Sequence, residues 1–408
     1  MMKKSLFLLF MVCLFIISFS CSKDPISEDE GAVSEEGDPS GFLSSGSGSE
    51  GGGASGSGEN EGGQGADDGE AGKITAGEWS DLDNWSFWKD LLNWQEYSEM
   101  PDYWNFYTSG RIVVEVKNTL GLPVNNVKVE IRSGDAVAWI ARTDNFGVAQ
   151  LWPGLFNKTE GNNSQNYILT VNDDPVAIQL VPFEDGVNEV TIKNPKPVSN
   201  KVELAFIVDA TGSMSDELEF LKEDLKDVIR KVENKNASIK VSTGTVFYRD
   251  VEDDYLVKHS PFSRDINSTV SFINKQRAGG GGDFPEAVHT ALNTALTELQ
   301  WSEDAKSRIA FLLLDAPPHY ESQVIDELHA AIKNAAEKGI KLIPVTASGI
   351  DKETEFLMRF FSLSTNGTYV FITNHSGIGN EHIEPSIGEY DVELLNELMV
   401  RLITKYSE

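Results

Sequence analysis

The sequence predicts an α/β domain with a mainly parallel sheet and helices on both faces, preceded by a small all-β antiparallel sandwich. Two patterns carry this prediction. From residue 201 onward, continuous apolar runs alternate with amphipathic helical stretches, which is typical of a parallel sheet buried on both sides. Between residues 111 and 193, short segments with period-two alternation are separated by turn signals, which favours an antiparallel sandwich.

The first twenty residues resemble a bacterial lipoprotein signal peptide. The apolar run at residues 6–19 follows two lysines, and it is too short and too close to the start of the chain for a comfortable spanning helix. A small residue then precedes Cys21, as in the lipoprotein cleavage box, although Ser18 stands where that box usually has leucine. The resemblance implies that residues 1–20 are removed and that Cys21 is acylated. An ordinary secretory signal with an incidental cysteine is the alternative.

Cysteine usage favours the lipid anchor. The two cysteines are Cys13, inside the apolar run, and Cys21 itself, so the mature chain would contain no disulfide. Several acyl chains on one cysteine bury enough CH₂ groups to hold a protein on a membrane. The stretches Ser22-Lys23-Asp24 and Glu28-Asp29-Glu30 are similar to the acidic export tag of surface lipoproteins in the Bacteroidetes group. The predicted location is the bacterial outer membrane or cell surface, with the lipid as the sole membrane contact.

Residues 21–72 are predicted to form a lipidated, disordered tether. From Ser27 to about Gly72 the chain is almost entirely glycine, serine, glutamate and aspartate, and such a segment cannot bury a core. A flexible coil of this length spans roughly 40 Å root-mean-square, which suits a tether that lifts a head off a membrane.

The chain is strongly acidic. Its formal net charge is −30, and loss of Lys3 and Lys4 with the signal segment would take it to −32. A chain of this charge repels phosphate backbones, which excludes nucleic acid as a partner, and it attracts divalent cations.

Residues 73–110 form a tryptophan-rich arm in this prediction. The aromatic side chains that crowd into it are Trp79, Trp85, Trp88, Trp94, Trp104, Phe106 and Tyr107. They form either an exposed platform for a glycan or peptide, or an arm that packs its rings onto the following domain. The second interpretation is favoured, because large exposed aromatic clusters are costly for solubility and rare outside binding sites.

Residues 111–193 are predicted to form the β-sandwich, as a stalk. The expected strands are residues 112–117, 127–131, 137–142, 167–171, 176–181 and 187–192. Residues 124–151, with an Asp-x-x-Gly turn from Asp144 to Gly147, resemble the carboxypeptidase-regulatory-like or prealbumin-like modules found as stalks on surface proteins. That resemblance implies that the turn joins two strands and carries no chemistry.

A proline-containing linker at residues 194–200 leads into the α/β region at 201–408. The expected strands are residues 202–208, 239–247, 309–314 and 340–345. The expected helices are residues 214–232, 266–275, 285–299, 322–337, 354–362 and 390–405.

Oxygen-bearing side chains follow the first strand of this region. Asp209, Thr211 and Ser213 are spaced two apart at the carboxyl end of the strand, where ligands bind in open parallel sheets. Ser213 or Ser215 acting as a helix cap is one interpretation. Capping alone would not require Asp209 or Thr211, whereas three hard oxygens on one rim are what a small divalent cation needs.

Further candidates converge on the same sheet edge. Asp315 follows the strand at 309–314, and Asp283 follows the glycine loop at 279–282. Asp250, after the second strand, is expected either to orient a metal-bound water or to form a salt bridge with Arg249 or another nearby base. His319 is a candidate for a supporting role beside the site, and Tyr248 is interpreted as a core residue.

Asp209, Thr211, Ser213 and Asp315 match the metal-ion-dependent adhesion site of von Willebrand factor A domains. The resemblance spans residues 202–407, and the Gly-Gly-Gly-Asp-x-Pro-Glu segment is similar to a bacterial and extracellular-matrix branch of that family. It implies a Rossmann-like fold, a divalent cation with Mg²⁺ ahead of Ca²⁺ or Mn²⁺, and a protein partner whose acidic side chain completes the coordination. Where adhesion-type members have threonine, this sequence has Gly281 or Gly282 beside Asp283. If Asp283 replaces that threonine, a third carboxylate would weaken capture of an acidic ligand and favour Ca²⁺.

The predicted function is therefore adhesion or scaffolding by a metal-dependent surface lipoprotein, and not catalysis. A glycan-binding protein that uses the tryptophan-rich arm is the alternative. A metal-dependent hydrolase is a third hypothesis, since a bound cation can activate water. The sequence argues against it, because it contains no second metal cluster, and residues 279–282 lack the Lys-Ser/Thr of a phosphate-binding loop.

Overall fold

The structure is a computed structural model that describes residues 70–158, 167–235 and 238–408, all within the compact unit Gln64–Glu408. The proposed signal peptide, Cys21 and the tether up to residue 69 lie outside the described residues. Within the described ranges, no helix is both long and apolar enough to cross a membrane.

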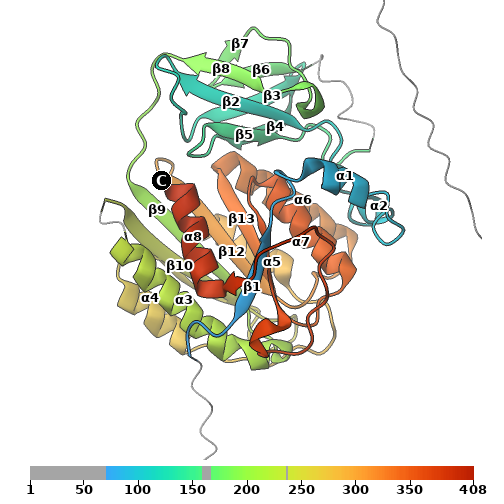
Figure 1. The fold of residues 1–408 in the computed structure, drawn as a ribbon, viewed down its shortest axis with the longest axis vertical. Coiled ribbons are helices and arrows are strands. Elements are labelled where there is room, and N and C mark those ends of the chain that lie inside the picture. Colours follow the sequence, from blue (N-terminus) through green and yellow to red (C-terminus); the bar gives the residue numbers. More distant parts are fainter. Residues whose placement is uncertain (1–69, 159–166, 236–237) are drawn as a thin grey trace, which may run out of the picture. The chain divides into compact units, whose positions relative to one another are not determined.

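An eight-stranded sheet organises the C-terminal half of the chain (Figure 1), in the order β11-β10-β9-β12-β13-β14-β1-β15. The parallel strands are β9 (Lys201–Asp209), β10 (Lys240–Tyr248), β12 (Ser307–Leu314), β13 (Ile340–Thr346) and β14 (Tyr369–Ile372). Antiparallel pairing adds β11 (Val257–Ser263), β1 (Thr75–Trp79) and β15 (Glu393–Leu394). All eight residues of β12 are buried, as expected for a continuous apolar strand covered on both faces.

Helices cover both faces of this sheet. One face is packed by α5 (Val288–Thr297), α6 (Ser322–Lys338) and α7 (Lys352–Ser364), and the other by α3 (Ser215–Lys235), α4 (Ile266–Asn274) and α8 (Leu395–Ser407). Each helix begins and ends within a few residues of the range that the sequence predicts. The predicted α/β fold class, with a mainly parallel sheet and helices on both faces, is confirmed.

The sequence predicts that the α/β region begins at residue 201, but its sheet also contains β1 from much earlier in the chain. Ala76 pairs with Ile372 and Trp79 with Tyr369, so the start of the tryptophan-rich arm belongs to the sheet. Gly77 permits this pairing, because a Cβ atom there would lie 2.4 Å from the ring of Phe371. Five residues containing glycine and glutamate have no strand signal strong enough to reveal a partner that lies far along the chain.

The β-sandwich has a three-stranded sheet in the order β5-β2-β8 and a four-stranded sheet in the order β4-β3-β6-β7. Its strands are β2 (Ile112–Asn118), β3 (Lys128–Ser133), β4 (Ala136–Arg142), β5 (Val148–Leu151), β6 (Ile168–Val171), β7 (Asp174–Val176) and β8 (Asn188–Ile192). Pairing is antiparallel except between β2 and β8, which run parallel. The prediction of a strand at 176–181 is wrong, because β7 ends at Val176. Strand β7 is a short edge strand that contains Pro175.

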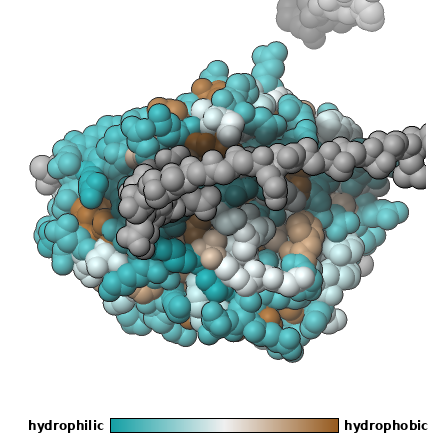
Figure 2. Space-filling view, turned by 90° about the horizontal axis from the view of Figure 1, so that it is seen from below, coloured by the Kyte–Doolittle hydropathy of each residue, from teal (hydrophilic) through white to brown (hydrophobic). Residues whose placement is uncertain are grey.

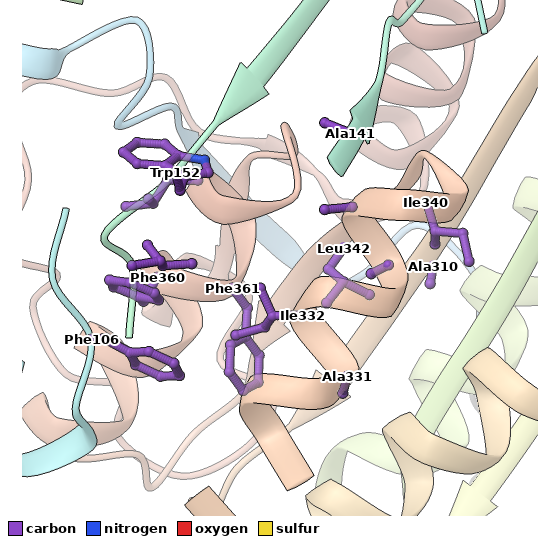
Figure 3. Packing of buried hydrophobic residues seen from close by; sticks show 14 of the residues in the cluster. Phe106, Ala141, Trp152, Ala310, Ala331, Ile332, Ile340, Leu342, Phe360 and Phe361 are labelled. Carbon is purple, nitrogen blue, oxygen red and sulfur yellow. The ribbon is translucent and has the colours of Figure 1, made fainter. Parts of the chain in front are cut away.

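The tryptophan-rich arm packs its rings inward. Besides β1 it forms α1 (Trp85–Leu91) and α2 (Met100–Trp104). The Trp88 ring stacks on Phe356 of α7 with 5.5 Å between centroids, and Phe106 stacks on Phe360 at 4.1 Å. Figure 3 shows Phe106 and Phe360 facing each other in the hydrophobic cluster that also contains Trp152 of the sandwich region. The aromatic-platform interpretation is wrong for the buried rings, which include Trp88 and Phe106, whereas Trp94 is 43% exposed.

The Asp144 turn ties the sandwich to the α/β domain. One carboxylate oxygen, Oδ1, accepts hydrogen bonds from the backbone N–H groups of Phe146 and Val148, as the turn requires. The other, Oδ2, lies 3.3 Å from Nζ of Lys341 on β13 and accepts a bond from Asn366. The turn thus joins two strands, as expected, and also holds the two folded regions together.

Candidate metal centre

The candidate site lies where the parallel strands end. Tyr248, the last residue of β10, pairs with Asp209, the last residue of β9. On the other side of β9, Leu313 of β12 pairs with Val208, which brings Asp315 to the same edge. Adjacent strands in register therefore gather side chains that are separated by more than one hundred residues in the sequence.

Asp209 is fully buried and is the centre of the site. Its Oδ1 accepts hydrogen bonds from the backbone N–H of Thr211 at 2.8 Å and from the hydroxyl of Thr211 at 2.7 Å. The Ser213 hydroxyl is 3.2 Å from the Thr211 hydroxyl. The other carboxylate oxygen of Asp209, Oδ2, is buried and has no hydrogen-bond partner. The structure thus brings three of the predicted residues together and leaves one carboxylate oxygen unpaired.

Asp315 completes the predicted group. It is 4% exposed, and its Oδ1 atom is also buried without a hydrogen-bond partner. Burial raises the pKa of Asp315 above its ordinary value, and the neighbouring Asp209 charge raises it further. Burial likewise raises the pKa of Asp209. Asp209 bonds to the Thr211 hydroxyl and Asp315 to the Ser213 hydroxyl, and neither carboxylate has a positively charged side chain paired with it.

Glu286 is a member of the cluster that sequence reasoning missed. The residue is 2% exposed, and its Oε2 atom is buried without a hydrogen-bond partner. Burial raises the pKa of Glu286 to about 9, with further contributions from Asp209, Asp250 and Asp315. Its backbone N–H donates to the carbonyl of Pro317, which ties it to the loop after Asp315. The available signal was its place in the Gly-Gly-Gly-Asp-x-Pro-Glu segment.

Asp283 does not join the cluster. Its side chain is exposed and has no hydrogen bond or ion pair to another described residue. The glycine loop is instead positioned through its backbone: the N–H of Gly281 donates to Asp253, and the carbonyl of Gly280 accepts from Gly212. Both Gly280 and Gly281 have positive φ, and this turn brings Glu286 to the rim while Asp283 remains at the surface.

The supporting residues differ in their placement. His319 and Asp250 form a hydrogen-bonded pair, with 2.7 Å between Nε2 and Oδ1. The base that pairs with Asp250 is therefore His319 and not Arg249, whose guanidinium donates to the carbonyl of Arg277. Ser215 begins α3 and is exposed. Thr211 precedes the 3₁₀ turn before α3 without a side-chain capping bond.

Tyr248 is a buried core residue, as expected, but its hydroxyl group faces Asp209, Asp315 and Glu286, which together form the acidic rim of the sheet. The nearby Asp209 and Asp315 charges, together with burial, raise the pKa of this phenol well above its ordinary value. The hydroxyl interacts with the Asp209 carboxyl and lowers the pKa of that carboxyl, although the two groups do not reach the geometry of a regular hydrogen bond.

The donor set fits a small divalent cation. Among the described residues, no three histidine, cysteine, aspartate or glutamate side chains are grouped closely enough to hold a metal ion. The rim combines carboxylates with the Thr211 and Ser213 hydroxyls, and hard oxygens of both kinds are the ligands that Mg²⁺ and Ca²⁺ take. Buried, unpaired carboxylate oxygens are costly unless an ion compensates them.

Figure 2 shows the end of the molecule toward which the parallel strands run in Figure 1. Outside the residues drawn in grey, this face is mostly hydrophilic, with scattered hydrophobic spots. Three exposed hydrophobic residues directly follow candidate site residues in the sequence. They are Val251 after Asp250, Phe284 after Asp283 and Tyr320 after His319.

Comparison with known sequences supports the fold assignment. The family model of the von Willebrand factor A domain matches residues 203–377. An ariadne-like RING finger protein of Acanthamoeba polyphaga mimivirus is 35% identical over 125 residues, which cover 31% of this chain and 12% of that protein. The alpha-protein kinase vwkA of Dictyostelium discoideum is 24% identical over 211 residues, 52% of this chain and 33% of that protein. The chain thus spans a third or less of these curated relatives.

Two solved structures also resemble part of the chain. BatB from Bacteroides thetaiotaomicron covers 50% of this chain and 98% of its own length, with 16% identity and a TM-score of 0.33. An aerotolerance-related membrane protein from Bacteroides fragilis covers 50% of this chain and 99% of its own, with 17% identity and a TM-score of 0.32.

Residues 203–377, which match the family model of the von Willebrand factor A domain, contain the parallel strands β10, β12, β13 and β14 and nearly all of β9. The sheet and its helices therefore agree with the architecture that this match predicts.

Proposed function

We propose that this chain is a surface lipoprotein that binds a protein partner through a divalent cation, with Mg²⁺ the first candidate. The observation that carries the proposal is the set of buried carboxylate oxygens of Asp209 and Asp315 that have no hydrogen-bond partner. They lie at the carboxyl edge of the sheet, beside the hydroxyls of Thr211 and Ser213.

The residues of the rim have separate roles in this proposal. Asp209 and Asp315 supply charge, partly through water, and Thr211 and Ser213 supply neutral oxygens. The exposed position of Ser213 leaves the outer side of the site open to solvent. A cation held there would present a free coordination position, which an acidic side chain of a partner protein can fill. Asp250 and His319 would orient water at the rim.

Calorimetry of the full-length protein in detergent micelles tests the proposal. After treatment with a chelator, the wild type should bind one Mg²⁺, Mn²⁺ or Ca²⁺ ion, and Asp209→Asn should remove this binding. Asp254→Asn is the matched control, because it removes the same charge from a side chain that is 95% exposed. Equal heats from wild type and Asp209→Asn would leave the proposal without support.

Stability provides a second readout of the same site. A ligand that binds the folded state alone stabilises it by about 2.7 kcal/mol when its concentration is one hundred times Kd. Saturating Mg²⁺ should therefore raise the free energy of unfolding of the wild type and of Asp254→Asn. It should leave that of Asp209→Asn unchanged.

The lipid anchor belongs to the same proposal and rests on the sequence before residue 22. Acylated Cys21 would hold the protein at the outer membrane, and Cys21→Ser should move the protein from the membrane fraction to the soluble fraction. Cys13→Ser is the matched control and should leave the distribution unchanged. Membrane retention of the Cys21→Ser variant would contradict a lipid anchor.

A metal-dependent hydrolase is the second candidate, and the His319–Asp250 pair beside the rim favours it. A histidine held by a carboxylate is a common general base. Turnover of a chromogenic phosphate or carboxylate ester with Mg²⁺, lost in His319→Ala, would support a hydrolase. Binding of Mg²⁺ without turnover, in wild type and His319→Ala alike, supports a binding protein.

A further inference from the structure

The glycine-rich loop delivers an acidic side chain to the candidate cation site, and the structure distinguishes between two possible residues. Asp283 directly follows the glycines, and Glu286 lies three residues later. Asp283 is exposed and makes no polar contact with the described rim, whereas Glu286 is 2% exposed. The two carboxylates lie in the same loop, but only that of Glu286 is buried beside the rim.

The Glu286 carboxylate lies next to Gly281 and Thr211. A Cβ atom added to Gly281 would lie 3.0 Å from Oε1 of Glu286 and 3.3 Å from Cβ of Thr211. The carboxylate and the rim threonine therefore border the same small space, and Gly281 keeps that space free. The backbone of Glu286 is fixed independently, through its hydrogen bond to the carbonyl of Pro317 and its bridge to Pro318.

The charges around Glu286 are the second argument. The groups that act on it most strongly after burial are Asp209, Asp250 and Asp315, and each is negative. Its Oε2 atom is buried without a hydrogen-bond partner, as are one oxygen of Asp209 and one of Asp315. Three acidic side chains, each with a buried unpaired oxygen, point to a missing positive charge among them.

We propose that Glu286, and not Asp283, is the carboxylate that the glycine-rich loop supplies to the cation site. The inference rests on the proposed function, because it assigns a third acidic residue to the same centre. Because no three such side chains among the described residues are grouped closely enough to bind one ion directly, Glu286 would act on the cation through water, adding negative charge to a site of two carboxylates and two hydroxyls.

Two conservative substitutions test the assignment in the full-length protein. Calorimetric titration with Mg²⁺, Mn²⁺ and Ca²⁺ should show affinity for the cation reduced about tenfold or more in Glu286→Gln. Asp283→Asn should change affinity by less than about threefold, since its side chain is exposed. The inference is overturned if Asp283→Asn weakens binding about tenfold, or if Glu286→Gln leaves it within about threefold.

A pair of glycine variants tests the geometry. Gly281→Ala would fill the space between Glu286 and Thr211, in a residue with φ of +71°, and should weaken cation binding. Gly282→Ala is the matched control, because no atom lies within 4 Å of an added Cβ there. Equal affinities in the two variants would contradict a carboxylate placed across that space.

The outcomes separate this inference from the proposed function. If the wild type binds none of the three cations, the proposed function fails. If the wild type binds and Asp209→Asn does not, the function stands, and the comparison of Glu286→Gln with Asp283→Asn decides the inference alone. Urea unfolding in chelator should show Glu286→Gln at least as stable as the wild type, which excludes misfolding as the cause of weak binding.

Discussion

Two buried charge clusters on the same sheet are built in opposite ways. Arg359 of α7 has no solvent exposure; its Nε and Nη2 atoms bond to Asp81 at 2.9 and 2.6 Å, and Nη1 lies 3.4 Å from Glu355. Every one of these charges has an opposite charge in contact. At the carboxyl edge of the sheet, Asp209 and Asp315 lie together with unpaired oxygens.

The two clusters differ in whether opposite charges compensate the buried groups. Burying a charge is tolerated when a partner and hydrogen bonds compensate it, and the Arg359 cluster contains its own compensation. This cluster joins α7 to the start of the tryptophan-rich arm. Among the described residues, no lysine or arginine forms an ion pair with Asp209 or Asp315, so a bound proton or, in our proposal, a cation would compensate them. Substitutions should therefore have opposite effects on stability at the two places.

The largest effect is expected at the structural cluster. Asp81→Ala leaves the guanidinium of Arg359 buried with one acidic partner, and breaking a buried pair in this way costs about 3–5 kcal/mol. Urea unfolding measures the loss. Asp90→Ala, an exposed residue of α1, should change the free energy of unfolding by less than about 0.5 kcal/mol. Equal losses in the two variants would contradict this account.

A smaller loss is expected where the sandwich meets the α/β domain. Asp144→Ala removes the acidic partner of Lys341, a buried residue whose pKa burial lowers. The lysine can lose its proton in compensation, so the expected cost is about 2–3 kcal/mol, including the bonds of the turn. Unfolding monitored by a sandwich probe and by an α/β probe should then separate into two transitions. A single unchanged transition would show that this contact does not couple the regions.

At the acidic rim, removing a charge should stabilise the protein and not destabilise it. In chelator at pH 8, Asp315→Asn should raise the free energy of unfolding by about 1–2 kcal/mol, because the variant no longer buries an uncompensated charge. The folded-state pKa of Asp315 is raised, so stability in chelator is greatest at low pH and falls as the pH rises above the ordinary value of 3.8. Saturating Mg²⁺ should remove this fall in the wild type. Destabilisation by Asp315→Asn in chelator would contradict an uncompensated rim.

The smallest change in the free energy of unfolding is expected at Asp224. This residue is buried and acidic like those of the rim but lies outside it, so it shows what burial does without a cation site. Burial raises the pKa of Asp224 to about 7, although the N–H of Gly72 donates to it. Stability should fall as the pH rises from about 4 to about 7, and Asp224→Asn should recover about 1 kcal/mol at pH 8. Mg²⁺ should not alter this difference. A magnesium-dependent change would place Asp224 in the cation site.

Much of the α/β domain could be predicted because its signals are local. Continuous apolar runs predict buried parallel strands, and the Asp-x-Thr-x-Ser spacing places three oxygens at the end of one strand. Asp315 was found by the same reasoning at a second strand end, and the structure brings it beside Asp209. The sandwich strands are recognisable from period two, except where β7 is short and contains proline.

The amino-acid sequence by itself determined the fold class, the main strands and helices, and four of the residues that meet at the rim. Only the tertiary structure decided that residues 75–79 complete the sheet, that the arm's tryptophan rings other than Trp94 are buried, and that Glu286 lies in the cluster while Asp283 lies at the surface. The reason is physical: side-chain periodicity is fixed by the local backbone, whereas strand partners and loop conformations depend on contacts between residues far apart in the chain.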